Sequence, residues 1–314
     1  MYTSGAAHRC VRRRNKPVLT MLLCLVVGLL SALELPAAPY VIGVPALGPG
    51  REVLSRWAPV VDSVSELTGQ SIRLVIESEQ RELMSGLRGR RLDAVLLDPI
   101  SVYRLSSEVP LQVLATVALG ARAELNGESR PQYVLIVPSR SRTFAPVHTM
   151  GQAVSVPDLH NHPSVAVYTA MVFQDADLPI PRFEYADTQE SILKGVSYGQ
   201  LQVGVVSRSL LSDPAMTDFV SNVRPIALTR ETPPWVMVGR IDGQSEVHDQ
   251  IAAVLVGDLS TQYSNRGVRF FSPEVMYNNV DGGMLDVSES DAALLERALQ
   301  LLRVLEVTAH VPSE

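Results

Sequence analysis

Cysteine is nearly absent from this chain of 314 residues, and lysine is equally scarce. Both cysteines, Cys10 and Cys24, lie within the first 38 residues. Beyond that segment the sequence therefore excludes disulfides, a thiolate nucleophile and a cysteine-based metal site. The one lysine beyond it, Lys194, lies on a predicted exposed helix face, which leaves Schiff-base chemistry a single poor candidate.

Recognisable catalytic and metal-binding motifs are also lacking. The Gly-x-Ser-x-Gly pattern at 195–199 stands at the end of a predicted helix and not on the strand-to-helix turn of a nucleophile elbow, and no glycine-rich phosphate loop follows a predicted strand. His160 and His162 are close in sequence but precede Pro163 in an expected surface loop; a fortuitous metal site is the alternative. We therefore expect no enzyme activity, no catalytic residue, no cofactor and no metal.

The first 38 residues differ from the rest of the chain. Five basic residues precede an apolar run at 18–33 that is too short for a comfortable transmembrane helix. The run closes at Pro36-Ala37-Ala38, an ending in small residues that suits signal peptidase. We predict a signal peptide over residues 1–38 and a periplasmic location; an uncleaved membrane anchor is the alternative.

The remainder of the chain is acidic. Five of the 27 basic residues and one of the 33 acidic residues lie in the first 38, so 22 and 32 remain, a net charge of −10. This balance argues against nucleic acid or an anionic membrane surface as the partner. It does not exclude an anionic small ligand, because a helix N-terminus can hold an anion within an acidic protein.

The most informative stretch is LDAVLLDPISVY, residues 92–103. Its apolar run is short and branched, as in a buried strand. Asp98 is a good N-cap and Pro99 fits the first helical position, so a helix should follow the strand directly. In open α/β sheets ligands bind at such strand ends, where Ser101 and Tyr103 would offer hydroxyls. An ordinary buried strand with a capped helix is the alternative.

Strands and helices alternate through the first half of the chain, as in a parallel sheet covered on both faces. The expected strands are residues 40–44, 71–76, 92–97, 111–117 and 133–137, and the expected helices are 51–67, 81–87 and one from Asp98.

After Pro138 the polar stretch 139–143 predicts a linker to a second lobe. Apolar runs predict buried strands there at 164–168 and 203–206, and Asp187-Thr188-Gln189-Glu190 is a capping signal that opens a helix to about Val196. Strands at 223–228 and 236–240 should return to the first lobe, followed by amphipathic helices at 246–259 and 289–305.

In this order the sequence resembles the periplasmic substrate-binding proteins of phosphate, phosphite and phosphonate ABC transporters. The resemblance covers about residues 40–259, and several short motifs carry it together. These are YVIGVP at 40–45, Trp57-Ala58-Pro59, LDAV and DPISVY within 92–103, Tyr133 opening a strand, Val156-Pro157-Asp158-Leu159 before SVAVY, and QESILKGV at 189–196 leading to VGVVS.

The resemblance implies an α/β protein of two lobes, type II-like, each lobe a mixed sheet flanked by helices. The helix expected at 289–305 is an addition to the two-lobed fold that the resemblance implies. The implied boundaries are residues 39–137 for the first part of lobe 1, 138–222 for lobe 2, and 223–314 for the return to lobe 1 with the C-terminal helix.

The resemblance also implies ligand-binding residues in a cleft between the lobes. It places Tyr103 and Tyr133 on the cleft as aromatic hydrogen-bond donors from the first lobe; Ser101 is expected there from its position after the strand end. The family's phosphonate-binding turn at a helix N-terminus, Ser-Thr-Ser-Gly, falls on residues 168–171, where Tyr168 and Thr169 stand first. Only the threonine is kept.

Two ionisable residues of the family's cleft are replaced by amides. Its histidine falls on Gln189 and its acidic residue on Gln202. A glutamine can donate and accept hydrogen bonds but cannot neutralise a ligand's charge. The ligand is therefore expected to be a phosphonate-like oxyanion or a more neutral analogue, or else the cleft binds a protein partner.

The predicted function is capture of a small molecule by a monomeric protein for an inner-membrane ABC permease. The alternative is a sensory protein that signals to a membrane kinase. Nucleic acid is not an expected partner.

Overall fold

The computed structural model describes residues 38–48, 50–119, 130–242, 245–273, 277–279, 285–287 and 289–309. Residues 39–314 form one compact unit, and everything below concerns that unit. The expected signal peptide lies outside the described residues apart from Ala38. Within the described part of the chain, no helix is long and apolar enough to cross a membrane.

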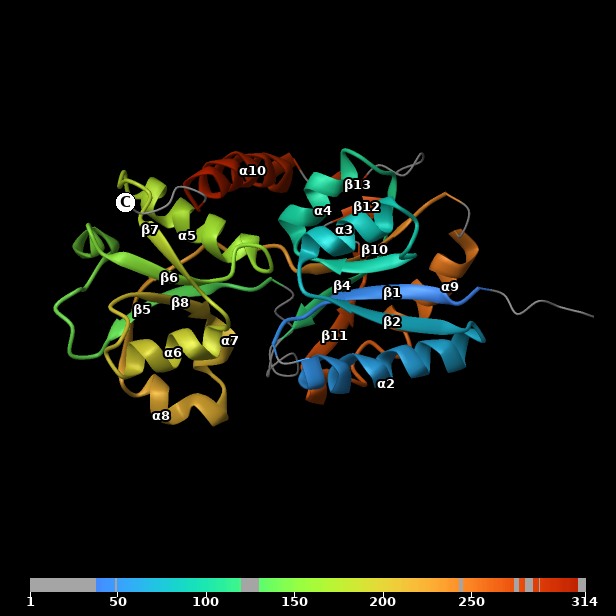
Figure 1. The fold of residues 1–314 in the computed structure, drawn as a ribbon, viewed down its shortest axis with the longest axis horizontal. Coiled ribbons are helices and arrows are strands. Elements are labelled where there is room, and N and C mark those ends of the chain that lie inside the picture. The colour runs from blue at the N-terminus through green and yellow to red at the C-terminus, as the bar shows by residue number, and fades with distance from the viewer. Residues whose placement is uncertain are drawn as a thin grey trace, which may run out of the picture. The chain divides into compact units, whose positions relative to one another are not determined.

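The first lobe is a six-stranded mixed sheet with the order β11-β4-β10-β3-β1-β2 (Figure 1). Its strands are β1 (Tyr40–Pro45), β2 (Ile72–Glu77), β3 (Ala94–Leu97), β4 (Leu111–Leu119), β10 (Trp235–Arg240) and β11 (Val268–Phe271). Strands β2, β1 and β3 are parallel, whereas β10 is antiparallel to both β3 and β4. β10 therefore brings the chain back into the centre of this sheet after its passage through the second lobe.

Helices cover both faces of the first sheet. They are α2 (Gly50–Thr68), α3 (Gln80–Arg88), α4 (Pro99–Ser106) and α9 (Ser245–Val256). Alternate residues of β1 point to opposite faces: Ile42 packs in the cluster with α2 and α9, and Val41 in the cluster with α3 and α4. The strand is buried on both sides, which explains its continuous apolar run.

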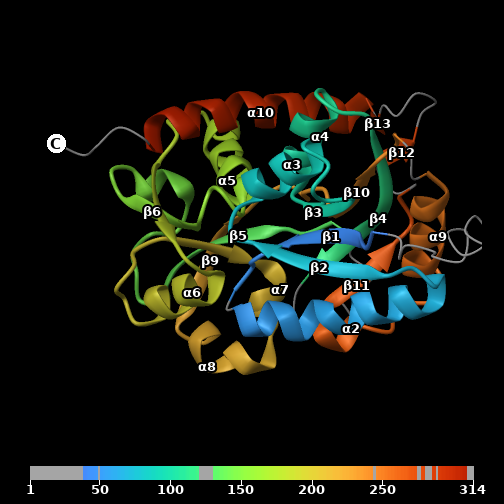
Figure 2. The same ribbon diagram turned by 45° about the vertical axis from the view of Figure 1, so that its right-hand side comes forward.

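The second lobe is a five-stranded sheet with the order β7-β6-β8-β5-β9. Its strands are β5 (Tyr133–Pro138), β6 (Ala153–Pro157), β7 (Arg182–Ala186), β8 (Gly204–Ser207) and β9 (Val223–Leu228). Helices α5 (Pro163–Asp175) and α6 (Gln189–Ser197) pack on opposite faces of β5, since Leu135 clusters with α5 and Ile136 with α6. Figure 2 shows α6 with the short helices α7 (Arg208–Leu211) and α8 (Thr217–Val220) along one side of this lobe. The described residues also include 3-10 turns η1 (Pro146–Thr149), η2 (Pro214–Met216) and η3 (Ser264–Arg266), and a small sheet of β12 (Tyr277–Asn279) and β13 (Leu285–Val287).

The chain enters the second lobe earlier, and returns to the first lobe later, than the sequence patterns predict. β5 and β9 both belong to the second sheet, so the crossings lie between β4 and β5 and between β9 and β10. The stretch 139–143, expected as a linker between lobes, therefore follows a second-lobe strand, and residues 223–228 do not return to the first lobe. Each expected boundary differs from the observed crossing by one strand.

Residues 164–168, expected as a strand, are helical and form the start of α5. Pro163 occupies the first helical position, and ten of the thirteen helix residues are buried. A short apolar run is equally compatible with a buried strand and a buried helix, which is why the pattern was ambiguous. The strand of this region is instead β6, AVSVP, which the sequence patterns did not identify.

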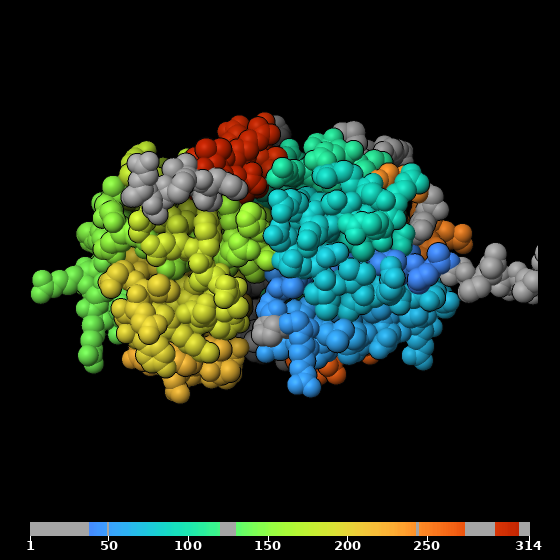
Figure 3. All heavy atoms as spheres, viewed as in Figure 1, coloured from blue at the N-terminus to red at the C-terminus, as the bar shows by residue number. Residues whose placement is uncertain are grey.

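The C-terminal helix α10 (Glu289–Ala309) is present as expected and packs against both lobes. Leu295, Leu301 and Leu305 are buried in the same cluster as residues of α4 and α5. At one seam Arg297 donates to Asp175 Oδ1 of α5 at 2.9 Å; at the other, Arg104 of α4 lies 3.5 Å from the Glu306 carboxylate. Figure 3 shows the atoms of α10 lying over the boundary between the lobes.

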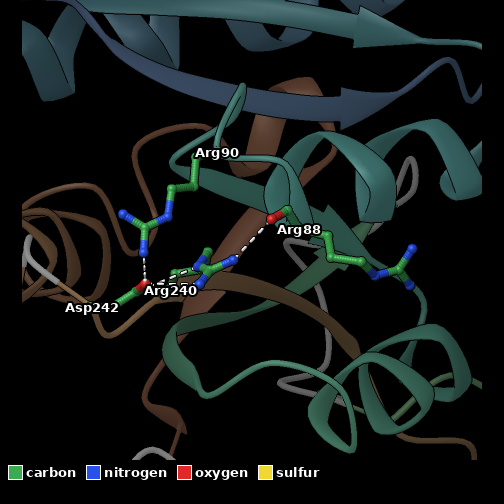
Figure 4. A network of polar contacts seen from close by, with 4 residues as sticks. All are labelled: Arg88, Arg90, Arg240 and Asp242. Carbon is green, nitrogen blue, oxygen red and sulfur yellow. Dashed lines mark hydrogen bonds and ion pairs between the residues drawn. The ribbon is translucent and has the colours of Figure 1, made fainter.

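A surface ion-pair network links the segment after α3 to the end of β10 (Figure 4). Arg240 donates two bonds of 2.7 Å to Asp242 and a third of 2.9 Å to the backbone oxygen of Arg88. Arg90 forms a further ion pair with Asp242. The hydrogen bond to Arg240 lowers the pKa of Asp242. Because the network is solvent-exposed, we expect it to contribute little to stability.

Candidate functional site

Two helix N-termini, one from each lobe, meet at the carboxylate of Asp98. This residue is the N-cap of α4, and its Oδ1 accepts a hydrogen bond of 3.0 Å from the backbone N–H of Ile100. From the other lobe, Ser164 in the first turn of α5 donates its hydroxyl to Oδ1 at 2.7 Å and its backbone N–H to Oδ2 at 3.4 Å. Asp98 and Ser164 are 2% and 1% exposed, so this is a buried, direct contact between the lobes.

Gln80 at the start of α3 provides a second contact between the lobes. Its Oε1 accepts from the backbone N–H of Asp98 at 2.9 Å, and its Nε2 donates to the backbone oxygen of Asn161 at 2.6 Å. Asn161 belongs to the loop that precedes α5. The side chain is 1% exposed, and an amide is well suited here because it donates and accepts at once.

Tyr133 lies beside this contact at the start of β5. Burial raises the pKa of its hydroxyl, and the negative charge of Asp98 raises it further. The Tyr133 hydroxyl lies near the Thr232 side chain, in the segment that returns to the first lobe, and Tyr168 of α5 is also close. We call Gln80, Asp98, Tyr133, Ser164 and Thr232 the interlobe cluster.

Burial shifts two ionisable groups of this region in opposite directions. It raises the pKa of Asp98 to about 6, although the hydrogen bonds from Ser164 and Ile100 partly oppose the shift. It lowers the pKa of His162, the N-cap residue of α5, to about 4. The His162 ring contacts Trp235 of β10 edge-on, with 6.0 Å between centroids. At neutral pH the Asp98 carboxylate is therefore ionised and the His162 imidazole is uncharged.

The residues expected to bind ligand are only partly brought together. Tyr133, which lies in the second lobe and not in the first as expected, is near both Asp98 and Tyr168, and Ser101 is buried on α4. Tyr103 is half-buried on α4 and packs against the apolar core. Tyr133 thus lies between Tyr168 and a carboxylate that the sequence indicated only as a helix cap.

The remaining three expected residues have other surroundings. Thr169 is fully buried inside α5, not at its N-terminus, and its hydroxyl donates to the backbone oxygen of Val165 at 2.7 Å. Gln189 accepts at Oε1 from the backbone N–H of Ser207 at 2.6 Å, within the second lobe. Gln202 is exposed. The helix N-terminus that the resemblance placed at residues 168–171 begins five residues earlier, at Pro163.

A cavity of about 370 Å³ lies elsewhere in the second lobe. It is bounded by residues 149–152, the C-terminal part of α5 at Phe173, and residues 179–182. None of the expected ligand-binding residues lines it. Among the described residues, no group of three or more histidine, cysteine or acidic side chains is placed to hold a metal ion.

A second buried polar cluster lies wholly within the first lobe. His248 of α9 is 1% exposed and contacts Tyr40 of β1 edge-on, with 5.7 Å between ring centroids. In the described part of the chain no group lies in hydrogen-bond geometry to either ring nitrogen of His248 or to the hydroxyl of Tyr40, although the backbone of Asp93 is close to the His248 ring. Burial lowers the pKa of His248, and nearby Asp93 opposes this shift only in part. We call Tyr40 and His248 the first-lobe cluster.

The cross-lobe role of Ser164 and Gln80 was missed from the sequence, although a signal for one of them exists. His162-Pro163-Ser164 repeats the cap-proline pattern of Asp98-Pro99-Ile100, and in both cases the residue after the proline donates its backbone N–H to Asp98. Two such patterns after two strands indicate two helix N-termini at strand ends. For Gln80 the sequence holds no comparable signal.

Solved structures with the same fold have low sequence identity to this chain. A Xanthomonas citri protein bound to ATP superposes with a TM-score of 0.65 at 14% identity, covering 88% of this chain and 100% of the other. PhnD1 from Prochlorococcus marinus, in complex with methylphosphonate, gives 0.61 at 12% identity, covering 83% and 97%. A binding protein of a phosphonate ABC transporter from Pseudomonas aeruginosa gives 0.59 at 13%, covering 86% and 98%. These likenesses confirm the two-lobed α/β fold.

No curated protein sequence matches the chain significantly. A family model does: that of the periplasmic substrate-binding protein of phosphonate ABC transporters matches residues 42–268, most of both lobes. The chain therefore belongs to the family of periplasmic phosphonate-binding proteins of ABC transporters.

Proposed function

We propose that this protein captures a small molecule between its two lobes in the periplasm and delivers it to an inner-membrane ABC permease. The observation that carries the proposal is the interlobe cluster, in which buried polar groups of both lobes converge at two helix N-termini. Family membership supports the same function. No chemical step is part of it.

Capture would proceed by hinge motion at the two crossings between the lobes. A ligand that contacts both lobes favours the closed arrangement by the difference between its affinities for the closed and open forms. Ser101, Tyr133 and Tyr168 are the ligand contacts we propose, with Tyr103 and Gln189 at the margins of the site. Thr169 and Gln202 are the least favoured of the expected contacts. The Thr169 hydroxyl is hydrogen-bonded within its own helix, and the Gln202 side chain is exposed to solvent.

The test is a thermal-shift screen of the exported protein, purified from cells that express the full chain. The panel contains phosphate, phosphite, methylphosphonate, sulfonates and neutral polar metabolites. A ligand present at about 100 times its dissociation constant should add about 2.7 kcal/mol of stability.

Tyr133→Phe should then weaken binding of that ligand, whereas Tyr185→Phe, at a β7 residue that is 40% exposed, should not. Equal affinity in both variants would remove Tyr133 from the site. No shift with any compound would count against small-molecule capture and favour a protein partner.

We further propose that residues 1–38 direct export, that the mature protein begins at Pro39, and that it is monomeric. Mass spectrometry of the exported protein should give the mass of residues 39–314, and light scattering should give a single chain. A mass that includes the leader would indicate a membrane-anchored form instead.

A further inference from the structure

The N-termini of α4 and α5 are both occupied by a group of the protein itself. A helix N-terminus has free backbone N–H groups and a positive end of the helix dipole, so it favours an anion. In both helices a proline stands first and lacks an N–H, and the next residue, Ile100 or Ser164, donates its N–H to Asp98. The Asp98 carboxylate therefore occupies the anion-binding position at the N-termini of both α4 and α5.

The donors that Asp98 receives are all uncharged. They are the backbone N–H groups of Ile100 and Ser164 and the Ser164 hydroxyl, at 3.0, 3.4 and 2.7 Å. The Asp98 charge is therefore balanced by dipoles and not by a basic side chain among these contacts. The Ser164 hydroxyl and N–H, which a bound anion would need at the start of α5, are both already used.

An anionic ligand at this position would meet two obstacles. It would have to displace the Asp98 carboxylate from Ser164, and it would then lie beside a buried negative charge. Two like charges about 4 Å apart near a protein surface disfavour each other enough to weaken binding by roughly a hundred- to a thousand-fold. A neutral or cationic group meets no such repulsion and can accept or donate to Tyr133 beside it.

We propose that Asp98 determines the specificity of the interlobe site by acting as a built-in anion, so that the natural ligand is a neutral or cationic polar molecule and not an oxyanion. The inference rests on the proposed function of ligand capture and names the chemical class of its ligand. It also predicts that removal of this one carboxylate exposes an anion site at the start of α5.

Two variants at this position separate charge from folding. Asp98→Ser leaves a good N-cap for α4 and makes room beside Ser164, and Asp98→Asn keeps the shape of the side chain without its charge. Asp242→Asn is the matched control, because it removes the same charge from the exposed network after β10. Circular dichroism and thermal unfolding establish that each variant is folded.

The experiment is isothermal titration of the wild-type protein and the three variants with methylphosphonate. We expect Asp98→Ser to bind at least a hundred-fold more tightly than the wild type, Asp98→Asn to gain less because its amide still fills the position, and Asp242→Asn to match the wild type. Wild-type affinity equal to or greater than that of Asp98→Ser would overturn the inference. So would the absence of methylphosphonate binding in both folded Asp98 variants.

A parallel titration with neutral and cationic polar compounds distinguishes this inference from the proposed function. If the wild type binds methylphosphonate tightly and Asp98→Ser does not improve on it, the inference is wrong and ligand capture stands. If Asp98→Ser gains methylphosphonate binding while the wild type binds nothing in either panel, the role of Asp98 is supported and ligand capture loses its support.

Discussion

The interlobe cluster and the first-lobe cluster are buried to the same degree but differ in their hydrogen bonding. The Asp98 carboxylate has three donors and the amide of Gln80 is paired at both ends. In the first-lobe cluster no group of the described residues lies in hydrogen-bond geometry to either His248 nitrogen or to the Tyr40 hydroxyl. Tyr40 and Tyr133 are each 5% exposed, so exposure alone does not distinguish the two environments.

The difference indicates two uses of a buried polar residue. In the interlobe cluster the polar atoms determine how two lobes meet, and each lost bond leaves an unpaired group. In the first-lobe cluster the rings fill space. A Cβ on Gly239 of β10 would lie only 2.6 Å from His248 Cε1, so the ring occupies the volume next to this glycine. Four changes, taken from the largest expected effect to the smallest, test this contrast.

Asp98→Ala should have the largest effect on stability. It removes the N-cap of α4 and leaves the Ile100 and Ser164 donors unpaired in a buried place, which should cost about 3 kcal/mol of unfolding free energy. Urea denaturation measures the loss. Asp98→Asn can still accept at Oδ1 from the Ile100 N–H and the Ser164 hydroxyl, although not from the Ser164 N–H, and should lose less than half as much. Equal losses would mean that charge, not hydrogen bonding, is what matters.

Gly239→Ala should destabilise the first lobe by packing alone. The added methyl group forces the His248 ring to move, which should cost about 1–3 kcal/mol. The same substitution made in a His248→Ala background should cost much less, because the ring is gone. A double-mutant cycle gives the interaction free energy, and an additive result would show that the ring is not the obstacle.

Acidification should act oppositely on the two clusters. The folded-state pKa of Asp98, about 6, lies above its ordinary 3.8, so Asp98 stabilises the fold below about pH 4 and this contribution is lost as pH rises through 6. The folded-state pKa of His248 lies below 6.5, so its contribution is present above pH 6.5 and is lost as pH falls.

Unfolding free energies at about pH 7.5 and about pH 5 test these signs. On acidification the wild type should gain about 1 kcal/mol relative to Asp98→Asn and should lose stability relative to His248→Phe. His162 acts with the sign of His248, since burial lowers its pKa to about 4, and it is unchanged in both comparisons. A wild type that loses stability relative to Asp98→Asn would contradict the assignment of the raised pKa.

The smallest expected effects on stability come from a matched pair of substitutions, each of which removes one tyrosine hydroxyl from a cluster. Tyr133→Phe removes a hydroxyl that interacts with Thr232 and should cost about 1 kcal/mol. Tyr40→Phe removes a hydroxyl without a partner and should change stability by less than about 0.5 kcal/mol. Equal effects of the two substitutions would remove the distinction between the clusters.

Much of the fold follows from local signals in the sequence. The run at 94–97, the Asp98 cap and the proline after it predict a strand and a helix that are both confirmed, as is the capped helix that Thr188 opens. The two-lobed α/β class is confirmed as well. These features depend on residues that are neighbours in the chain, where propensity and capping act directly.

What the sequence could not predict depends on pairing over long separations. Residues 164–168 are buried on all sides because α5 lies between a sheet and α10, and such a helix has no exposed polar face to reveal its period. The Asp98–Ser164 contact joins residues 66 positions apart, and neither residue type indicates the other. In the sequence Gln80 is likewise an ordinary residue at the start of a helix. Its role depends on the backbone oxygen of Asn161, which only the folded second lobe brings within reach.

The packing of α10 on both α4 and α5 has a consequence for the kinetics of ligand entry. Lobes that are joined by a shared helix and by Asp98 must separate at one of these seams before a ligand can enter. We therefore expect the observed association rate to level off with increasing ligand concentration, at a ceiling set by the rate of lobe opening and not by diffusion.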